Sequence, residues 1–446
     1  MSYLTYMAKS SLQRLPGSGY FIKQMIWKSL VKKEILVSKL SNHLKGAALV
    51  SPYTVYWIDP ACIEFHTNYQ KDSQDWEDLV FDQKKFVVKV QDGDWDIPVH
   101  RVADMRAFRA IHDRIHHGKA WQTSEYYQYA VKQIESGQEL WQCSSRASFD
   151  RHCDNIDRLI ESINNHGYLA RSTDQINPVS PLDKEILINI SRDGSCLFQD
   201  GRHRLAISLA LGFKQVPVQV LVRHASWVSF REYMKRMAMR QNGGASKGGM
   251  LYQNPLHFDL VDIPHMHSCE DRWDAIKNHL APELGVALDI GCNLGFFCHR
   301  LEEIGYSCLG VEYSPDCAYA AEKIAAAEHR KFKVLTGDIL TLDAFQGANT
   351  SVFNVVLALN IFHHFIKTQD GYEKLRQFMN NIQIGTMFFE SHLPDELQMQ
   401  GAFFNPTPNQ FVQLLKDWGG FERAMPIYTT TDGRTIFKLD QQRQKR

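Results

Sequence analysis

The stretch that decides the fold of the carboxy-terminal half reads Val-Ala-Leu-Asp-Ile-Gly-Cys-Asn-Leu-Gly-Phe-Phe, from Val286 to Phe297. Its apolar residues predict a buried strand that ends at Asp289, and the small residues that follow predict a turn leading into a helix. Gly291 and Gly295 allow the backbone to approach a ligand at the carboxyl edge of a parallel sheet, where Asp289 can accept from an ammonium group. A nicotinamide dinucleotide site requires G-x-G-x-x-G, whereas the spacing here is G-x-N-x-G with Asn293 in the middle, which disfavours a dehydrogenase.

A regular alternation of strands and helices follows this stretch and places polar residues at strand ends. The further strands are expected over residues 307–312, 332–336, 353–359 and 386–389, with two more in an antiparallel hairpin over 421–439. Glu312 ends the second strand, where a carboxylate can accept from both hydroxyls of a ribose. Asp338 follows the third strand and can accept from an adenine amino group, and Asn360 follows the fourth. The alternative for Asp289 or Asp338 is that the side chain caps the following helix.

Taken in order, these motifs resemble the class I S-adenosylmethionine-dependent methyltransferases over about residues 270–440. The resemblance implies an α/β fold with a doubly wound, Rossmann-like sheet of seven strands, and S-adenosylmethionine as cofactor. In that family the first motif holds the methionine part, the second the ribose and the third the adenine. The residues that the resemblance assigns to the cofactor are Asp289, Gly291, Asn293, Gly295, Glu312, Asp338, Ile339 and Asn360. Asn293 stands where the family usually has glycine, and asparagine tolerates left-handed geometry better than most residues.

The candidate catalytic residues are Asn360, which would lie near the transferred methyl group, and three histidines, His363, His364 and His392. A histidine could remove the proton of a hydroxyl or amine acceptor. The alternative is that the histidines are structural, because displacement at a sulfonium requires mainly alignment. The polar-Pro-Pro-aromatic tetrapeptide of nucleic-acid methyltransferases does not follow the fourth strand. We therefore expect a small-molecule, sugar or lipid-linked acceptor.

A second informative segment spans about residues 186–224, where a hairpin delivers Asp200 and Gly201 to a helix start. Backbone N–H groups at a helix start, together with arginines, make a phosphate site. The segment resembles the ParB/sulfiredoxin-like fold, which predicts an α/β (α+β) domain before the methyltransferase. The candidate phosphate-binding residues are Asp200, Gly201, Arg202, His203 and Arg204. Arg202 takes the place of the sulfiredoxin cysteine, so redox chemistry is not expected; the alternative to phosphate binding is a structural ion-pair cluster.

Composition excludes several classes of protein. Lys+Arg and Asp+Glu number 50 each, and this balance gives no strong signal for nucleic-acid binding. The nine cysteines are odd in number and lack zinc spacing, so we expect reduced thiols, a cytoplasmic protein and no metal site. No apolar run reaches the roughly 18 residues of a membrane span. Asp92-Gly-Asp-Trp-Asp96 could hold a divalent metal, but a solvated turn is the favoured interpretation.

A chain of 446 residues exceeds what one hydrophobic core normally organises. The expected parts are a basic amphipathic segment (1–50), a ParB/sulfiredoxin-like region (51–240), a glycine-rich linker (241–250) and a methyltransferase domain (251–446). The first part holds eight basic side chains against one acid, so it could contact a membrane surface or a partner, or pack on the protein with a solvated lysine face.

The favoured function is methyl transfer to a small-molecule or glycan-type acceptor, with the amino-terminal domain binding the substrate or a phosphate group. One rival is a bifunctional protein whose amino-terminal domain binds or hydrolyses a nucleotide, in the manner of a kinase. The other rival is a non-catalytic scaffold that binds S-adenosylmethionine.

Overall fold

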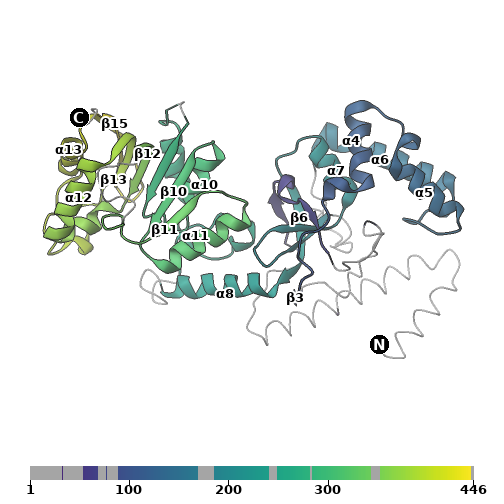
Figure 1. The fold of residues 1–446 in the computed structure, drawn as a ribbon, viewed down its shortest axis with the longest axis horizontal. Helices are drawn as coiled ribbons and strands as arrows, with labels where there is room; N and C mark the ends of the chain where they lie inside the picture. The colour runs from purple at the N-terminus through teal and green to yellow at the C-terminus, as the bar shows by residue number, and fades with distance from the viewer. Residues whose placement is uncertain are drawn as a thin grey trace. The chain divides into compact units, whose positions relative to one another are not determined.

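The structure is a computed structural model that describes residues 33, 54–68, 77, 89–168, 185–240, 249–281, 284–342 and 352–442 (Figure 1). Its contacts divide the chain into two compact units, Met1–Glu232 and Tyr233–Arg446, and the division falls within α8 (Ala225–Arg240). The expected basic segment 1–50, apart from Lys33, and linker residues 241–248 lie outside the described residues. Among the described residues, no helix combines the length and apolar character needed to cross a bilayer.

The amino-terminal unit contains a mixed sheet whose strands run in the order β1-β6-β4-β5-β2, with β3 paired to β6. Its strands are β1 (Tyr56–Ile58), β2 (Phe65–His66), β3 (Lys89–Gln91), β4 (Ile186–Ile190), β5 (Cys196–Asp200) and β6 (Val216–His224). β4 and β6 are buried along their whole length, as continuous apolar runs predict. β4 and β5 pair antiparallel, which confirms the predicted hairpin.

Capping residues mark the ends of several helices in this unit. The helical elements are η1 (Pro60–Cys62), η3 (Val102–Asp104), α4 (Arg106–His117), η4 (Trp121–Thr123), α5 (Glu125–Glu135), α6 (Arg146–His166) and α7 (Arg202–Ala210). The longest, α6, begins with a reciprocal capping box between Ser145 and Ser148 and ends at Gly167. α7 begins after Gly201, which has φ of 92° and would bring a Cβ within 3.0 Å of the Ile186 Cα.

The carboxy-terminal unit contains a sheet in the strand order β11-β10-β9-β12-β13-β15-β14 (Figure 1). Its strands are β9 (Val286–Ile290), β10 (Ser307–Glu312), β11 (Lys333–Thr336), β12 (Val352–Leu359), β13 (Gln383–Glu390), β14 (Phe421–Thr429) and β15 (Thr435–Gln442). The first five pair in parallel, and β15 pairs antiparallel with both β13 and β14. β10 and β12 lie on opposite sides of β9, so the strand order reverses there, and ligands of open α/β sheets bind at the carboxyl ends of such strands.

Helices cover both faces of this sheet. The helical elements are η7 (Phe258–Leu260), α9 (Glu270–Lys277), α10 (Phe296–Glu303), α11 (Pro315–Ala327), η9 (Phe362–Lys367), α12 (Gln369–Asn381), η10 (Leu397–Met399) and α13 (Pro408–Gly419). A short parallel pair, β7 (Leu251–Gln253) and β8 (His265–His267), precedes α9.

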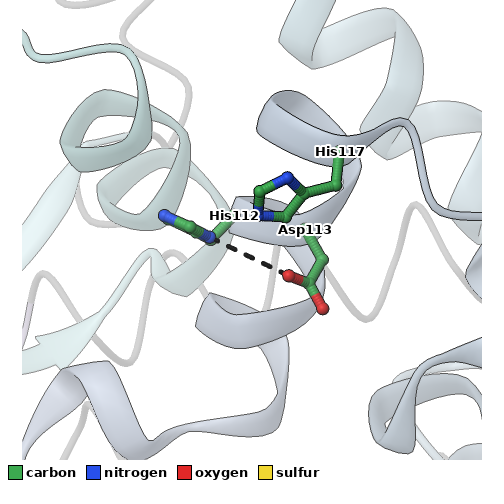
Figure 2. A group of neighbouring side chains, drawn as sticks. All are labelled: His112, Asp113 and His117. Atoms are coloured by element: carbon green, nitrogen blue, oxygen red, sulfur yellow. Dashed lines mark ion pairs between the residues drawn. The ribbon is translucent and has the colours of Figure 1, made fainter.

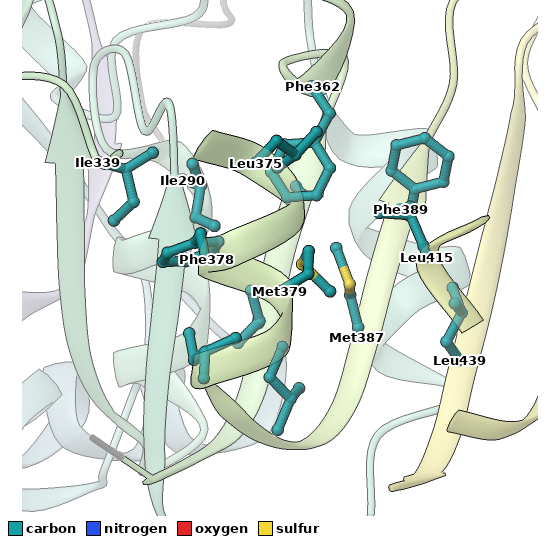
Figure 3. Packing of buried hydrophobic residues seen from close by; sticks show 14 of the residues in the cluster. Ile290, Ile339, Phe362, Leu375, Phe378, Met379, Met387, Phe389, Leu415 and Leu439 are labelled. Atoms are coloured by element: carbon teal, nitrogen blue, oxygen red, sulfur yellow. The ribbon is translucent and has the colours of Figure 1, made fainter. Parts of the chain in front are cut away.

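Apolar side chains that alternate between the two faces of the sheet form two clusters. Figure 3 shows the cluster in which Ile290 of β9 and Met387 of β13 pack with Leu375 of α12 and Leu415 of α13. Phe389 belongs to this cluster, whereas its neighbour Phe388 belongs to the other cluster, with helices α9, α10 and α11. Successive side chains of a strand point to opposite faces, so β13 is buried on both. The sheet is therefore covered on both sides, and its polar carboxyl edge is where a ligand site can form.

Candidate cofactor and catalytic site

The loop between β9 and α10 has all of its backbone N–H groups from Gly291 to Gly295 engaged in hydrogen bonds. The first two N–H groups, of Gly291 and Cys292, donate to the Val311 carbonyl oxygen, and the Asn293 N–H donates to Glu312 Oε2. The last two, of Leu294 and Gly295, donate to Gln253 Oε1 and to the Cys292 carbonyl oxygen. A loop that cradles a pyrophosphate must point free N–H groups at the ligand. This loop offers none, which supports the exclusion of a dinucleotide.

Three residues of this loop adopt left-handed backbone conformations, with φ of 76° at Gly291, 52° at Asn293 and 79° at Gly295. Asn293 therefore occupies a conformation that asparagine tolerates, which explains how it can stand where the resembling family has glycine. A Cβ at Gly291 would lie 2.9 Å from the Ile361 side chain, so glycine is also required there by close packing.

Asp289 lies one residue before the end of β9 and is 2% exposed. Its carboxylate accepts a hydrogen bond from the Cys298 thiol at 3.6 Å. Burial raises the pKa of Asp289 to about 7, and the negative charge of Glu312 adds to this rise. The alternative role as a helix cap is wrong, because α10 has Gly295 at its N-cap and no capping side chain. A cation bound beside this carboxylate would offset the cost of its burial.

Glu312 connects the ends of β9 and β10. Its Oε2 accepts from the backbone N–H of Asn293 and its Oε1 from that of Ser314, both at 2.8 Å. Burial raises the pKa of Glu312, while these N–H groups act in the opposite direction. Each carboxylate oxygen has a further lone pair, so the fixed side chain can still accept hydroxyl groups.

Asp338 and Ile339 follow β11. Asp338 Oδ1 accepts from the backbone N–H of Leu340 at 3.0 Å, so this side chain stabilises a local turn rather than the start of a helix. Ile339 is 2% exposed and belongs to the core cluster of Figure 3. Their contact with an adenine stays a prediction.

Asn360 follows β12 with φ of 53°. Its Nδ2 donates to the Tyr252 hydroxyl at 2.9 Å, and its backbone N–H donates to the Glu390 carbonyl oxygen. Among the described residues, Asn360 Oδ1 and Asn293 Oδ1 are buried without a hydrogen-bond partner. Buried acceptors without partners are costly, and a bound ligand would satisfy them.

The three candidate histidines differ in their surroundings. His363 and His392 are 2% and 0% exposed, and their ring centroids lie 5.7 Å apart. Each directs Nε2 at an amide oxygen, His363 at Gln398 Oε1 and His392 at Asn405 Oδ1. Each therefore donates from Nε2 and leaves Nδ1 as a bare acceptor.

Burial lowers the pKa of His363 to about 3 and also lowers the pKa of His392, so both rings are neutral near pH 7. His364 is exposed, and its Nδ1 lies 3.5 Å from the Lys367 ammonium. His364 is therefore the least shielded of the three from solvent.

Comparison with known proteins identifies part of the chain. Residues 288–382 match a family model described as a methyltransferase domain. The chain contains a methyltransferase domain. A curated relative, tRNA U34 carboxymethyltransferase of Helicobacter acinonychis (strain Sheeba), is 22% identical over 198 residues, 40% of this chain and 72% of the relative.

Solved structures with a similar domain include the bifunctional kinase-methyltransferase WbdD, at 18% identity and TM-score 0.37. That match covers 44% of this chain and 45% of WbdD, so this chain spans less than half of that protein. The N-terminal domain of EvdMO1 with SAH bound matches at 16% identity and TM-score 0.34, over 48% of this chain and 97% of the other. The family match confirms the predicted enzyme class, an S-adenosylmethionine-dependent methyltransferase, and its cofactor.

The residues of the methyltransferase domain fit this cofactor. Asn293 Oδ1, which has no hydrogen-bond partner among the described residues, and the buried carboxylate of Asp289 suit a ligand that carries an ammonium and a sulfonium charge. Glu312 can accept from ribose hydroxyls. When bound, the cofactor would supply an activated methyl group.

A polar cluster in the methyltransferase domain was missed by sequence reasoning. Arg272 of α9 forms a bidentate ion pair with Glu390 at the end of β13, and Arg434 pairs with Glu396 at 3.0 Å. The Tyr252 ring, which supports Asn360, packs edge-on against His267 at 4.8 Å. Arg272 and Glu390 are more than 100 positions apart in the sequence, and so are Tyr252 and Asn360. No local sequence pattern therefore indicates these contacts.

The predicted phosphate segment lies at the start of α7 in the amino-terminal unit. The exposed Asp200 accepts from the Gly201 N–H at 2.7 Å. Arg202 stacks over the Trp141 ring at 5.3 Å, and His203 Nε2 lies 3.1 Å from the Tyr126 hydroxyl. Burial lowers the pKa of His203 well below its usual value, so this ring is neutral. Phosphate binding by these residues and Arg204, and the ParB/sulfiredoxin-like fold, stay predictions.

The interpretation of Asp92–Asp96 as a solvated turn is wrong for Asp96, which is 3% exposed. Its carboxylate accepts from the backbone N–H of Arg192 at 2.7 Å and from the guanidinium of the same residue. Asp94 pairs with that guanidinium too, and Asp92 lies 3.6 Å from His224. Asp94 and Asp96 therefore hold the β4–β5 turn to this segment, whereas Asp92 lies beside the last residue of β6.

Proposed function

We propose that the protein transfers the methyl group of S-adenosylmethionine to a small-molecule or glycan-type acceptor at the carboxyl edge of β12 and β13. The single observation that supports this best is the buried Oδ1 of Asn360, which has no hydrogen-bond partner in the described part of the chain and lies at the topological switch point of the sheet. An amide oxygen at this point can accept a hydrogen bond from the hydroxyl or amine group that is to be methylated. Asn360 would bind the acceptor group and orient it toward the methyl carbon.

Removal of the acceptor's proton is assigned to His392. Its Nε2 is fixed by Asn405, so its Nδ1 can accept a proton while the ring starts neutral. His363 shares the same arrangement, but a pKa of about 3 makes it a weak base, and general bases work best with a pKa near the operating pH. The proposal gives His363 the role of positioning the neighbouring His392 ring, and gives His364 no part in the chemistry.

The cofactor would be held by Asp289 and the Gly291–Gly295 loop at its methionine end, by Glu312 at the ribose and by Asp338 with Ile339 at the adenine. This assignment rests on the order of the motifs and on the fixed carboxylates described above. The methyltransferase domain is proposed to keep the seven-stranded plan of class I enzymes.

The amino-terminal unit is proposed to bind a phosphorylated part of the acceptor at the start of α7. Arg202, held over Trp141, and the N–H groups of the helix start could recognise a phosphate together. The neighbouring Arg204 and the Tyr126–His203 hydrogen bond would complete the polar surface. A nucleotide-hydrolysing activity at the same place is the second candidate, and it would require Arg204 for turnover.

The test is a methyl-transfer assay that measures formation of S-adenosylhomocysteine over a panel of sugars and nucleosides, each supplied with and without a phosphate. We expect turnover with a phosphorylated acceptor and a lower kcat in His392→Gln. Arg202→Ala and Arg204→Ala should raise KM for the phosphorylated acceptor alone. Cofactor binding without turnover on any acceptor would favour the scaffold, and ATP hydrolysis lost in Arg204→Ala would favour the bifunctional enzyme.

A further inference from the structure

The last two turns of α4 carry the sequence His-Asp-Arg-Ile-His-His, from His112 to His117. Residues four apart in a helix lie on one face, so this spacing makes two adjacent pairs, His112 with His116 and Asp113 with His117. Histidines at this spacing are a common way for one helix to chelate a metal.

The structure brings three of these side chains together. One ligand atom from each of His112, Asp113 and His117 lies within 4.8 Å of the others. Figure 2 shows the three side chains converging on one side of α4, with His112 Nδ1 4.0 Å from Asp113 Oδ1. The two histidines are exposed and Asp113 is half-buried, so an ion can reach the group from solvent.

We propose that His112, Asp113 and His117 bind a divalent transition-metal ion of the zinc class. Two imidazoles and one carboxylate are a ligand set suited to zinc, nickel or copper, whereas magnesium and calcium prefer sites made of oxygen atoms. The proposed site belongs to the amino-terminal unit and is independent of the methyl-transfer proposal. Three protein ligands leave one tetrahedral position for water or a bound group.

The surroundings of Asp113 already attract a cation. Lys119 Nζ pairs with Asp113 Oδ2 at 2.9 Å, and the site lies at the carboxy-terminal end of α4, where the helix dipole favours positive charge. Arg114, on the same turn, is paired instead with Asp157 at 2.8 Å. Lys119 is therefore the group that a metal ion must displace, and its removal should strengthen metal binding.

The experiment is a zinc titration of the untagged, full-length protein, fully reduced, in competition with a chromophoric chelator. We expect one equivalent of bound zinc and no competition from a large excess of magnesium. His112→Gln and His117→Gln should each weaken binding by about tenfold or more. Lys119→Met should tighten it, because the competing ammonium is gone.

One variant serves as the control for the loss of an exposed histidine. His166→Gln removes a histidine at the end of α6, away from the helix that carries the proposed ligands. It should bind zinc as the native protein does, and thermal unfolding should show that all variants are folded. The proposal is overturned if the native protein binds no zinc, if His112→Gln and His117→Gln bind it unchanged, or if Lys119→Met weakens binding.

Discussion

Arg272 and Glu390 form a buried bidentate ion pair, with both N–O distances at 2.9 Å. The pair joins α9 to the last residue of β13, and Glu390 also accepts at its backbone oxygen from the N–H of Asn360. Two parallel hydrogen bonds fix the carboxylate and the guanidinium in one plane. The ion pair therefore holds the strand end on which the proposed acceptor site is built.

Removal of one partner of this pair should destabilise the carboxy-terminal unit. Arg272→Met leaves the Glu390 carboxylate buried without its cation, and such changes cost about 3–5 kcal/mol. The thermal midpoint of the full-length chain should fall, whereas the double variant Arg272→Met, Glu390→Met should recover part of the loss. An unchanged midpoint in Arg272→Met would contradict the role given to the pair.

The Tyr252 hydroxyl should set the orientation of the Asn360 amide. Tyr252→Phe removes the acceptor of the Nδ2 hydrogen bond, and an unpaired buried donor costs about 1–3 kcal/mol, which allows the amide to turn. We expect kcat to fall by about tenfold while the KM for S-adenosylmethionine changes little. Tyr319→Phe, at an exposed position on α11, is the control and should retain native kinetics. Equal kinetics in Tyr252→Phe would show that the hydrogen bond is dispensable.

Cofactor affinity should rise with pH because of Asp289. The pKa of this carboxyl is raised to about 7 by burial, and the ammonium group of the cofactor favours the ionised form. Below pH 7 binding must release a proton, so affinity should fall by up to about tenfold per pH unit and level off above that pH. Calorimetry at several pH values would measure this slope, and Asp289→Asn should abolish it. A slope that survives in this variant would assign the titration to another group.

The same carboxyl should lower the stability of the cofactor-free protein at neutral pH. Between pH 3.8, the ordinary pKa of an aspartate, and about pH 7, the folded protein binds the Asp289 proton and the unfolded chain does not, so stability falls as pH rises. The loss is at most about 4 kcal/mol, because each tenfold change in proton affinity corresponds to about 1.36 kcal/mol. Asp289→Asn should therefore raise the thermal midpoint at pH 8 more than at pH 5. A smaller gain at pH 8 would mean that Asp289 is not buried as a charged group.

Much of the fold follows from local patterns. Strand β9, the hairpin of β4 and β5, and the antiparallel pair of β14 and β15 each appear in the structure as predicted. Apolar runs, helical periodicity and glycine stops lie within a few residues of one another, so the sequence displays them directly.

Contacts between distant residues could not be predicted in the same way. Asp96 meets Arg192 and Tyr252 meets Asn360 only because the chain folds them together. The local sequence around Asp96 therefore indicates a solvated turn, and no local pattern points to Tyr252. The group around His112 is different, because its spacing is local: Asp113 and His117 are four residues apart on one helix, next to His112.

The measurement that tests the central claim most directly is a calorimetric titration of the full-length protein with S-adenosylmethionine and S-adenosylhomocysteine. We predict one binding site in the native protein and a loss of binding in the double variant Asp289→Ala, Glu312→Ala, with Asp417→Asn on the exposed face of α13 as the matched control. Circular dichroism would show that each variant is folded. Absence of binding to folded native protein, or unchanged binding in the double variant, would contradict the account.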